Sequence, residues 1–140
     1  MNKGNRLRQA GYFVFGIFSV FGTLSSCQSQ QELKTEQYYV EGLQIYQMNC
    51  ANCHQENGEG LANLYPAITD SKLFSNEKEL ARLIKYGTKS NVEDHRPMPA
   101  NLNLKDLEIA EVITFLKVKW GKDSVYTDTE TVIKALEYQQ

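Results

Sequence analysis

The chain begins with a basic head and a continuous apolar run, and helical periodicity appears only later. Residues 1–8 contain three basic residues and no acidic one, and residues 10–24 read "AGYFVFGIFSVFGTL". This pattern predicts an export signal over residues 1–26 that is removed from the mature protein. A retained membrane span is the alternative, but the apolar run is shorter than the roughly 20 residues that cross a bilayer as a helix.

Three later segments repeat apolar residues at helical spacing, and each predicts an α-helix: 37–49, 77–86 and 104–119. Their apolar stripes are Val40, Leu43, Tyr46 and Met48; Leu80, Leu83 and Ile84; and Ile109, Val112, Ile113 and Leu116. The tail, residues 122–140, has one further brief helical pattern. No alternating segment of useful length predicts a strand. The fold class is therefore all-α, with about three to four short helices.

Polar residues mark where these helices begin and end and what lies between them. Asn76 and Asn103 are candidate N-caps for the second and third helices, and Gly87 suits the end of the second. Residues 27–36 are polar and predict a flexible tether ahead of the domain. Two long loops join the helices. Because a domain of this size has a small apolar core, such loops need something to hold them.

Charge narrows the classes of partner. The full sequence has a net charge of −2, and removal of residues 1–26 leaves 12 basic against 17 acidic residues, a net charge of −5. An acidic protein has no general attraction to nucleic acid or to anionic lipid. We therefore expect no nucleic-acid partner, and any membrane contact has to come from a covalent lipid.

The motif "CANCH", Cys50 to His54, carries the strongest chemical signal, and three chemistries fit its residue types. A zinc site needs four ligands, but the only other histidine is His95 and only one cysteine lies outside the motif. A thioredoxin-like dithiol would lie at the start of a helix that follows a buried strand, and this sequence predicts no strand. In an exported protein, the spacing C-x-x-C-H is the attachment signal for haem c. We therefore predict thioether bonds from Cys50 and Cys53, with the imidazole of His54 on the iron.

The second axial ligand has to come from elsewhere in the sequence, and the candidates are Met48, His95 and Met98. Met48 lies on the helix that leads into the motif, on the wrong side of the ring. Met98 lies in "RPMPA", where a proline on each side restricts the backbone of a long loop. We predict that His54 and Met98 are the axial ligands. The alternatives are a methionine that fills core space and ligation by His95, which would give a lower potential.

Four stretches, "GLQIYQMNCANCH", "LYPAI", "MPA" and "LKDLEIAEVITFLKVKWG", make residues 37–121 resemble a class I (His/Met-ligated) monohaem cytochrome c. The resemblance implies a cytochrome c fold wrapped around one covalently bound haem. It implies an electron carrier, not an enzyme, with no small-molecule substrate and with redox proteins docking transiently at the haem edge. An electron-entry subunit of a larger oxidoreductase, with the tail as a docking element, is the second hypothesis. A five-coordinate haem sensor or peroxidase-like protein is the third.

The same resemblance implies particular contacts. Gly42 and Tyr46 would pack against the last helix, at a partner such as Phe115. The backbone carbonyl of Pro66 would accept a hydrogen bond from His54 and orient its ring. Trp120 matches a terminal "WG". Candidate partners of the haem propionates are Arg82, Tyr86 and Arg96.

The end of the apolar run, "LSSC" at residues 24–27, resembles a bacterial lipobox. That resemblance implies cleavage before Cys27 and a diacylglycerol on its sulfur. The mature protein would then be a lipoprotein anchored to a membrane and facing the periplasm. The alternative is ordinary signal cleavage near Ser25 or Ser26, which would leave Cys27 as a free thiol.

Overall fold

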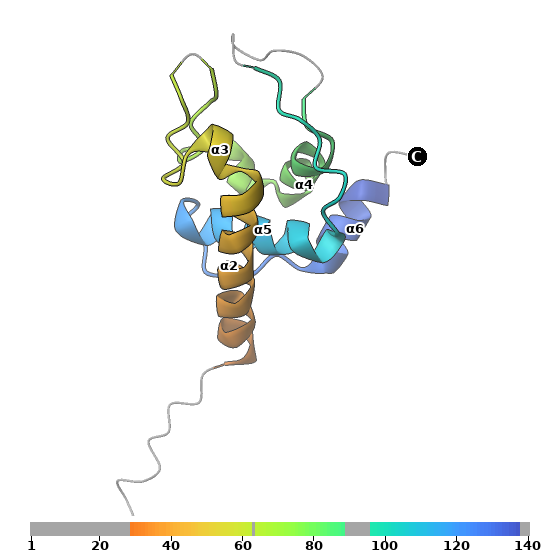
Figure 1. Cartoon of the computed structure of the whole chain (residues 1–140). Coiled ribbons are helices and arrows are strands. Elements are labelled where there is room, and N and C mark those ends of the chain that lie inside the picture. Colours follow the sequence, from red (N-terminus) through yellow and green to blue (C-terminus); the bar gives the residue numbers. More distant parts are fainter. Residues whose placement is uncertain (1–28, 63, 89–95, 138–140) are drawn as a thin grey trace, which may run out of the picture.

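The computed structural model describes residues 29–62, 64–88 and 96–137, and these ranges are helical with no strand. The α-helices are α2 (Gln30–Asn49), α3 (Ala51–His54), α4 (Glu77–Tyr86), α5 (Asp106–Lys119) and α6 (Thr129–Glu137), and a 3₁₀ turn, η2, covers Lys72–Ser75 (Figure 1). The all-α prediction is confirmed. The described residues hold five α-helices, more than the three to four expected, because "CANCH" forms its own turn and the tail forms α6.

Helix α2 begins earlier than predicted, so the expectation of a tether is wrong for residues 30–36. The Ser29 hydroxyl accepts a hydrogen bond from the Glu32 N–H (3.2 Å), and the Glu32 carboxylate accepts one from the Ser29 N–H (2.9 Å). This reciprocal capping box pairs two backbone donors and starts the helix there. None of the helices in the described ranges, α2 included, is long and apolar enough to cross a membrane.

Helix α5 crosses α2 at close range (Figure 1), and Gly42 lies at the point of closest approach. A Cβ atom at Gly42 would lie 2.1 Å from the backbone oxygen of Glu111 and 2.9 Å from Phe115 Cβ. Only glycine permits this approach, so the packing that the resemblance implied for Gly42 is confirmed. The predicted stripe of α2 needs correction, because Val40 and Met48 are 51% and 69% exposed. The residues that α2 buries are Thr35, Tyr38, Gly42, Ile45 and Tyr46.

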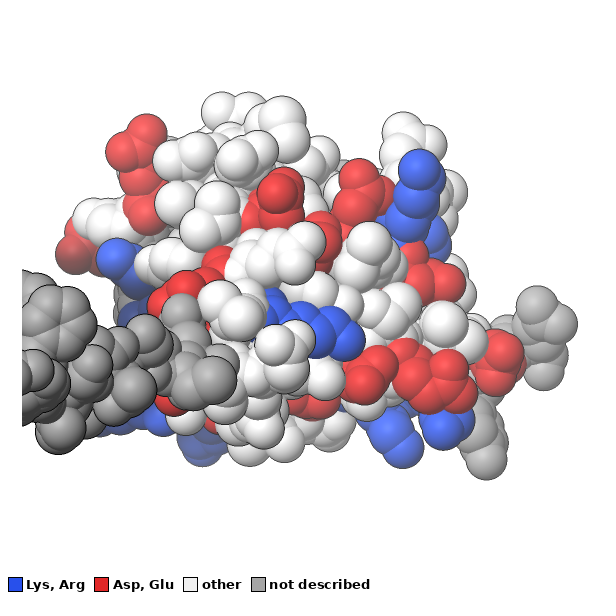
Figure 2. All heavy atoms as spheres, turned by 90° about the horizontal axis from the view of Figure 1, so that it is seen from below, with Lys and Arg blue, Asp and Glu red and all other residues white. Residues whose placement is uncertain are grey.

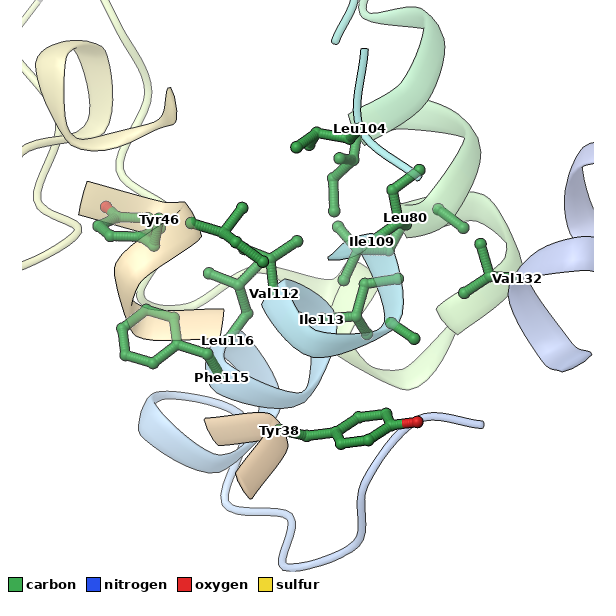
Figure 3. Packing of buried hydrophobic residues seen from close by; sticks show 14 of the residues in the cluster. Tyr38, Tyr46, Leu80, Leu104, Ile109, Val112, Ile113, Phe115, Leu116 and Val132 are labelled. Carbon is green, nitrogen blue, oxygen red and sulfur yellow. The ribbon is translucent and has the colours of Figure 1, made fainter. Parts of the chain in front are cut away.

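Aromatic side chains fill the crossing. The ring of Tyr46 lies 5.2 Å from that of Phe115 and 5.5 Å from that of Trp120, measured between centroids. Phe115 and Trp120 meet edge to face at 5.5 Å. Figure 3 shows Tyr46 and Phe115 side by side at one end of the buried cluster. Such pairs add to the area that they bury, so this cluster fixes the end of α2 that leads into "CANCH".

The caps of α4 and α5 have different outcomes. Asn76 caps α4 as predicted, since its side chain accepts a hydrogen bond from the Glu79 N–H (3.2 Å), and the helix stops at Gly87. The prediction of Asn103 as the cap of α5 is wrong. That helix begins at Asp106, and the Lys105 N–H donates to the Glu108 carboxylate (2.7 Å).

The tail belongs to the core. Val132 and Ala135 of α6 are fully buried against α4 and α5, and Figure 3 shows Val132 facing the common cluster.

The ammonium group of Lys117, on α5, is also buried, where it donates to the Glu77 carboxylate and lies 2.9 Å from Asp123. Burial alone would lower the pKa of Lys117, but these two carboxylates outweigh it and raise that pKa.

The start of α2 meets the segment that precedes α6. The ring of Tyr38 lies 5.4 Å from that of Tyr126, and the Tyr38 hydroxyl lies 3.3 Å from Thr129 Oγ1. The ammonium of Lys34 stands 4.3 Å from the centre of the Tyr126 ring, a cation–π contact. The first half of α2 therefore packs against the segment that leads into α6.

Candidate functional site

The two cysteines of "CANCH" lie on a single helical turn at the end of α2. Cys50 caps the end of α2, where its backbone N–H donates to the backbone oxygen of Tyr46 (2.9 Å). The same residue is the N-cap of α3. The N–H groups of Cys53 and His54 both donate to the Cys50 oxygen, at 3.1 and 3.0 Å. Both thiols are free and half-buried. They therefore stand one turn apart with the imidazole of His54 on the same short helix.

The orientation of His54 is fixed by the loop that follows it. Its Nδ1 lies 3.1 Å from the backbone oxygen of Pro66, the hydrogen bond that the resemblance implied. Because a carbonyl oxygen can only accept, Nδ1 must carry the proton, and Nε2 is left as the ring's free lone pair. The loop closes on itself through the Gly60 N–H to the His54 oxygen (2.9 Å) and the Ile68 N–H to the Gly58 oxygen (2.9 Å). It holds the Pro66 carbonyl against the ring.

A cavity of about 310 Å³ opens beside these residues. Cys50, Cys53 and His54 lie in its wall together with Pro66 and Met98, which come from the two long loops. Most of the remaining wall is apolar. Seven of its apolar residues come from η2, α4 and α5: Leu73, Phe74, Leu80, Leu83, Ile84, Val112 and Leu116. The structure thus joins residues far apart in sequence around one largely apolar cavity within the volume range of cofactor pockets.

Burial changes the acidity of two groups beside the cavity. It raises the pKa of the Cys50 thiol to about 11, with a further contribution from the nearby Cys53. Burial also raises the pKa of the Tyr46 hydroxyl to about 12. That hydroxyl donates a hydrogen bond to the backbone oxygen of Gln55 (2.6 Å). A thiol that stays protonated at neutral pH is a poor nucleophile. Cys50 is therefore not the acidic thiol that a thioredoxin-like dithiol uses.

The other candidates named from the sequence fall outside this cavity wall or outside the described ranges, with one exception. Met48 is exposed on α2, and Arg82 donates its Nε–H to the Ala135 oxygen (2.9 Å) of α6. Neither Arg82 nor Tyr86 lines the cavity, whereas Arg96 does. His95 and Cys27 lie outside the described residues. Among the described residues, no cluster of three or more His, Cys, Asp or Glu side chains could hold a metal ion.

Comparison with known proteins gives the family. A model of the cytochrome c family matches residues 39–120, more than half of the sequence. The protein belongs to the cytochrome c family. Cytochromes c bind haem c covalently and transfer electrons, so the matched residues form a cytochrome c electron-transfer domain.

Several relatives place this cytochrome c among different kinds of redox protein. Cytochrome c-552 of Thermus thermophilus is 30% identical over 59% of this chain and 70% of that protein. The cytochrome c subunit of the quinone alcohol dehydrogenase of Gluconobacter oxydans is 28% identical over 68% of this chain. The CcoP subunit of the cbb3-type cytochrome c oxidase of Helicobacter pylori is 24% identical over 67% of this chain. The matches span 21% of the first subunit and 32% of the second.

The residues of the cavity fit the cofactor that the family binds. The two thiols on one helical turn, the imidazole with its free Nε2 and the thioether of Met98 are the donor set for a covalent His/Met haem. The apolar walls suit a largely hydrophobic ring.

Sequence reasoning missed three polar residues of the cavity wall, Tyr65, Ser71 and Thr88. Tyr65 lies in the stretch "LYPAI", whose expected role rests on Pro66, and Ser71 and Thr88 belong to no motif; only the folding of the loops brings the three residues here. No local signal could have identified them.

Proposed function

We propose that this protein is a class I, His/Met-ligated monohaem cytochrome c that carries single electrons, as a lipoprotein facing the periplasm. The observation that supports it most is the cavity that joins Cys50, Cys53 and His54 to Met98. Cys50 and Cys53 would hold the haem covalently, and His54 and Met98 would be the axial ligands. When bound, haem c supplies the one-electron Fe(III)/Fe(II) couple.

The protein's own residues would set the orientation of the axial ligands and the reduction potential of this couple. The Pro66 carbonyl orients the His54 ring. A Met98 thioether favours the reduced state and raises the potential. Ligation by both side chains leaves no position for oxygen or a substrate, which supports a carrier and not an enzyme. The apolar side chains from α4 and α5 would pack against the haem and limit the access of water to it.

Redox partners would dock transiently at the mouth of the cavity, where contact areas are small. On the face seen from below in Figure 2, acidic and basic side chains are interspersed. Attachment to the membrane would come from a lipid on Cys27. Helix α2 begins only three residues later, at Gln30, so a helix and not a long tether would follow the lipid.

Spectroscopy of the mature, exported holoprotein tests the ligation. We expect the weak far-red sulfur-to-iron band in the oxidised protein and no binding of carbon monoxide by the reduced protein. A high-spin spectrum with ready binding of carbon monoxide would instead support the five-coordinate sensor or peroxidase-like protein. Mass spectrometry of the mature N-terminus tests the lipid, and an unmodified Cys27 would remove the anchor.

A fixed electron-entry subunit of a larger oxidoreductase is the second candidate, because two of the relatives are subunits of such complexes. The tail does not favour it, since Val132 and Ala135 bury the apolar face of α6 within the domain itself. Purification of the native protein in mild detergent separates the two candidates. A carrier elutes alone, whereas a subunit elutes with its complex.

A further inference from the structure

Met98 is bound at its backbone by one residue at the end of α4. The Met98 N–H donates to the hydroxyl of Thr88 (2.8 Å), and the Thr88 N–H donates to the Met98 oxygen (3.0 Å). Both residues line the haem cavity. The pair forms a two-bond clamp between positions ten residues apart, and one of its two acceptors is a side chain.

The backbone around this clamp is tightly packed. Gly87 has a positive φ of 67°, and a Cβ atom there would lie 2.2 Å from the Met98 oxygen. Three residues after Met98, the side-chain amide of Asn101 donates to the backbone oxygen of Ile84 (3.1 Å). The backbone N–H of Asn101 donates to the backbone oxygen of Lys85 (3.1 Å). The segment that carries Met98 is therefore attached to Thr88 at Met98 itself and, three residues later, to the last turn of α4 through Asn101.

We infer that Thr88 is a positioning residue that holds Met98 in place to ligate the haem iron. The inference rests on the proposed function, because it assigns a task to Thr88 only if Met98 is a ligand. Without the hydroxyl, the Met98 N–H loses its only acceptor among the described contacts and has to turn towards water. The segment would then leave the cavity wall more often. An external ligand could bind the iron at the coordination position that Met98 vacates.

Three variants of the holoprotein test this. Thr88→Val keeps the size and the backbone N–H but removes the hydroxyl, Thr88→Ser keeps the hydroxyl, and Thr88→Ala removes it without adding bulk. The matched control is Thr129→Val, which removes a hydroxyl that contacts Tyr38 away from the cavity. The measurements are the intensity of the far-red band and the affinity of the oxidised protein for added imidazole.

We expect Thr88→Val and Thr88→Ala to weaken the far-red band and to bind imidazole about tenfold more tightly, the scale of one hydrogen bond lost in a closed site. Thr88→Ser should stay within about twofold of the unsubstituted protein, since its hydroxyl can replace the bond. Thr129→Val should match the unsubstituted protein in both measurements. If Thr88→Val fails to mature, Thr88→Ala decides the question, because the smaller alanine adds no clash.

Two results would overturn the inference. One is a pair of hydroxyl-free Thr88 variants that keep the band and the imidazole affinity of the unsubstituted protein. The other is an equal rise in imidazole affinity in Thr129→Val, which would trace the effect to general loss of stability. An unsubstituted protein that lacks the far-red band would instead refute His/Met ligation itself, so the two failures are distinguishable.

Discussion

The two sides of the cavity are built in different ways. On one side, Cys50, Cys53 and His54 share a single turn that continues α2, and the aromatic cluster of the α2–α5 crossing lies directly beneath it. On the other side, Met98 lies in an irregular segment and is attached to the end of α4 by contacts between distant positions. The first side is local structure on a rigid helix. The second depends on loop closure.

This difference predicts different kinds of failure. The turn that carries Cys50, Cys53 and His54 is held by bonds between residues at most four apart, which cost little loop-closure entropy. Joining Thr88 to Met98 requires closing a loop, as does the bond from His54 to Pro66 that orients the imidazole. The His54 side should therefore be lost only with the fold or with the thioether bonds. The Met98 side should open while the rest of the molecule stays folded, because an irregular segment opens at a lower free energy than the packed helices of the core. The substitutions below are designed to affect one side at a time.

The largest effect should come from the double substitution Cys50→Ser and Cys53→Ser. Serine cannot form the thioether bonds, so we expect complete loss of covalent haem, measured as the mass of the denatured protein. The control is Cys27→Ser, which should keep one covalent haem per molecule while losing the lipid. Haem retained after denaturation of the double variant would contradict the proposed attachment site.

Met98→Ala should abolish the far-red band while one haem stays covalently bound. The potential should fall because the thioether that favours reduced iron is gone, and the reduced protein should bind carbon monoxide. Met48→Ala is the matched control, since Met48 is 69% exposed on α2 and should change none of these properties. A normal band in Met98→Ala would show that another residue ligates the iron.

Sequence patterns predicted the parts of this fold that depend on neighbouring residues. Helix α4 has the predicted range because Asn76 and Gly87 act on adjacent backbone groups. The early start of α2 also has a local signal, "SQQE" at residues 29–32, which matches a capping box. The polar residues around that signal favour a tether instead, and only the structure shows that the capping box prevails.

Other features depend on contacts that no local pattern contains. Val40 and Met48 are core residues by type, but the surface that α2 buries is set by where α5 crosses at Gly42. Thr88 is an ordinary polar residue until the backbone folds back to bring Met98 beside it. The cysteines and His54 could be identified because their chemistry requires a fixed short spacing, whereas the clamp on Met98 requires none.

Gly42→Ala tests the helix that supports the His54 side. The added Cβ would lie 2.1 Å from the Glu111 oxygen, which is backbone and cannot rotate away. We expect the free energy of unfolding to fall by about 1–3 kcal/mol, as overpacked sites do, despite the better helix propensity of alanine. Unfolding in guanidinium measures this. Gln44→Ala, at an exposed position of α2, should leave stability nearly unchanged, and an equally stable Gly42→Ala would contradict the close crossing.

The smallest effect concerns Asp123, which joins the tail to α5 and lies on neither side of the cavity. Burial would raise its pKa, but hydrogen bonds from Lys117 and from the Val125 and Ser124 backbone outweigh this and lower it below its usual 3.8. A carboxyl group with a lowered pKa stabilises the folded state at higher pH and loses that contribution as the pH falls through its folded pKa. Because the side chain is 40% exposed, screening should keep the contribution below about 1 kcal/mol.

Asp123→Asn should therefore be slightly less stable than the unsubstituted protein at pH 7, and this gap should close as the pH is lowered from about 5 towards about 3. Thermal unfolding of both holoproteins across that range measures the gap. Glu130→Gln, which breaks an exposed pair with Lys134, should show almost no gap at any pH. The far-red band should be the same in all three proteins at neutral pH, because this network touches neither His54 nor Met98. A gap independent of pH would mean that Asp123 contributes through packing and not through its charge.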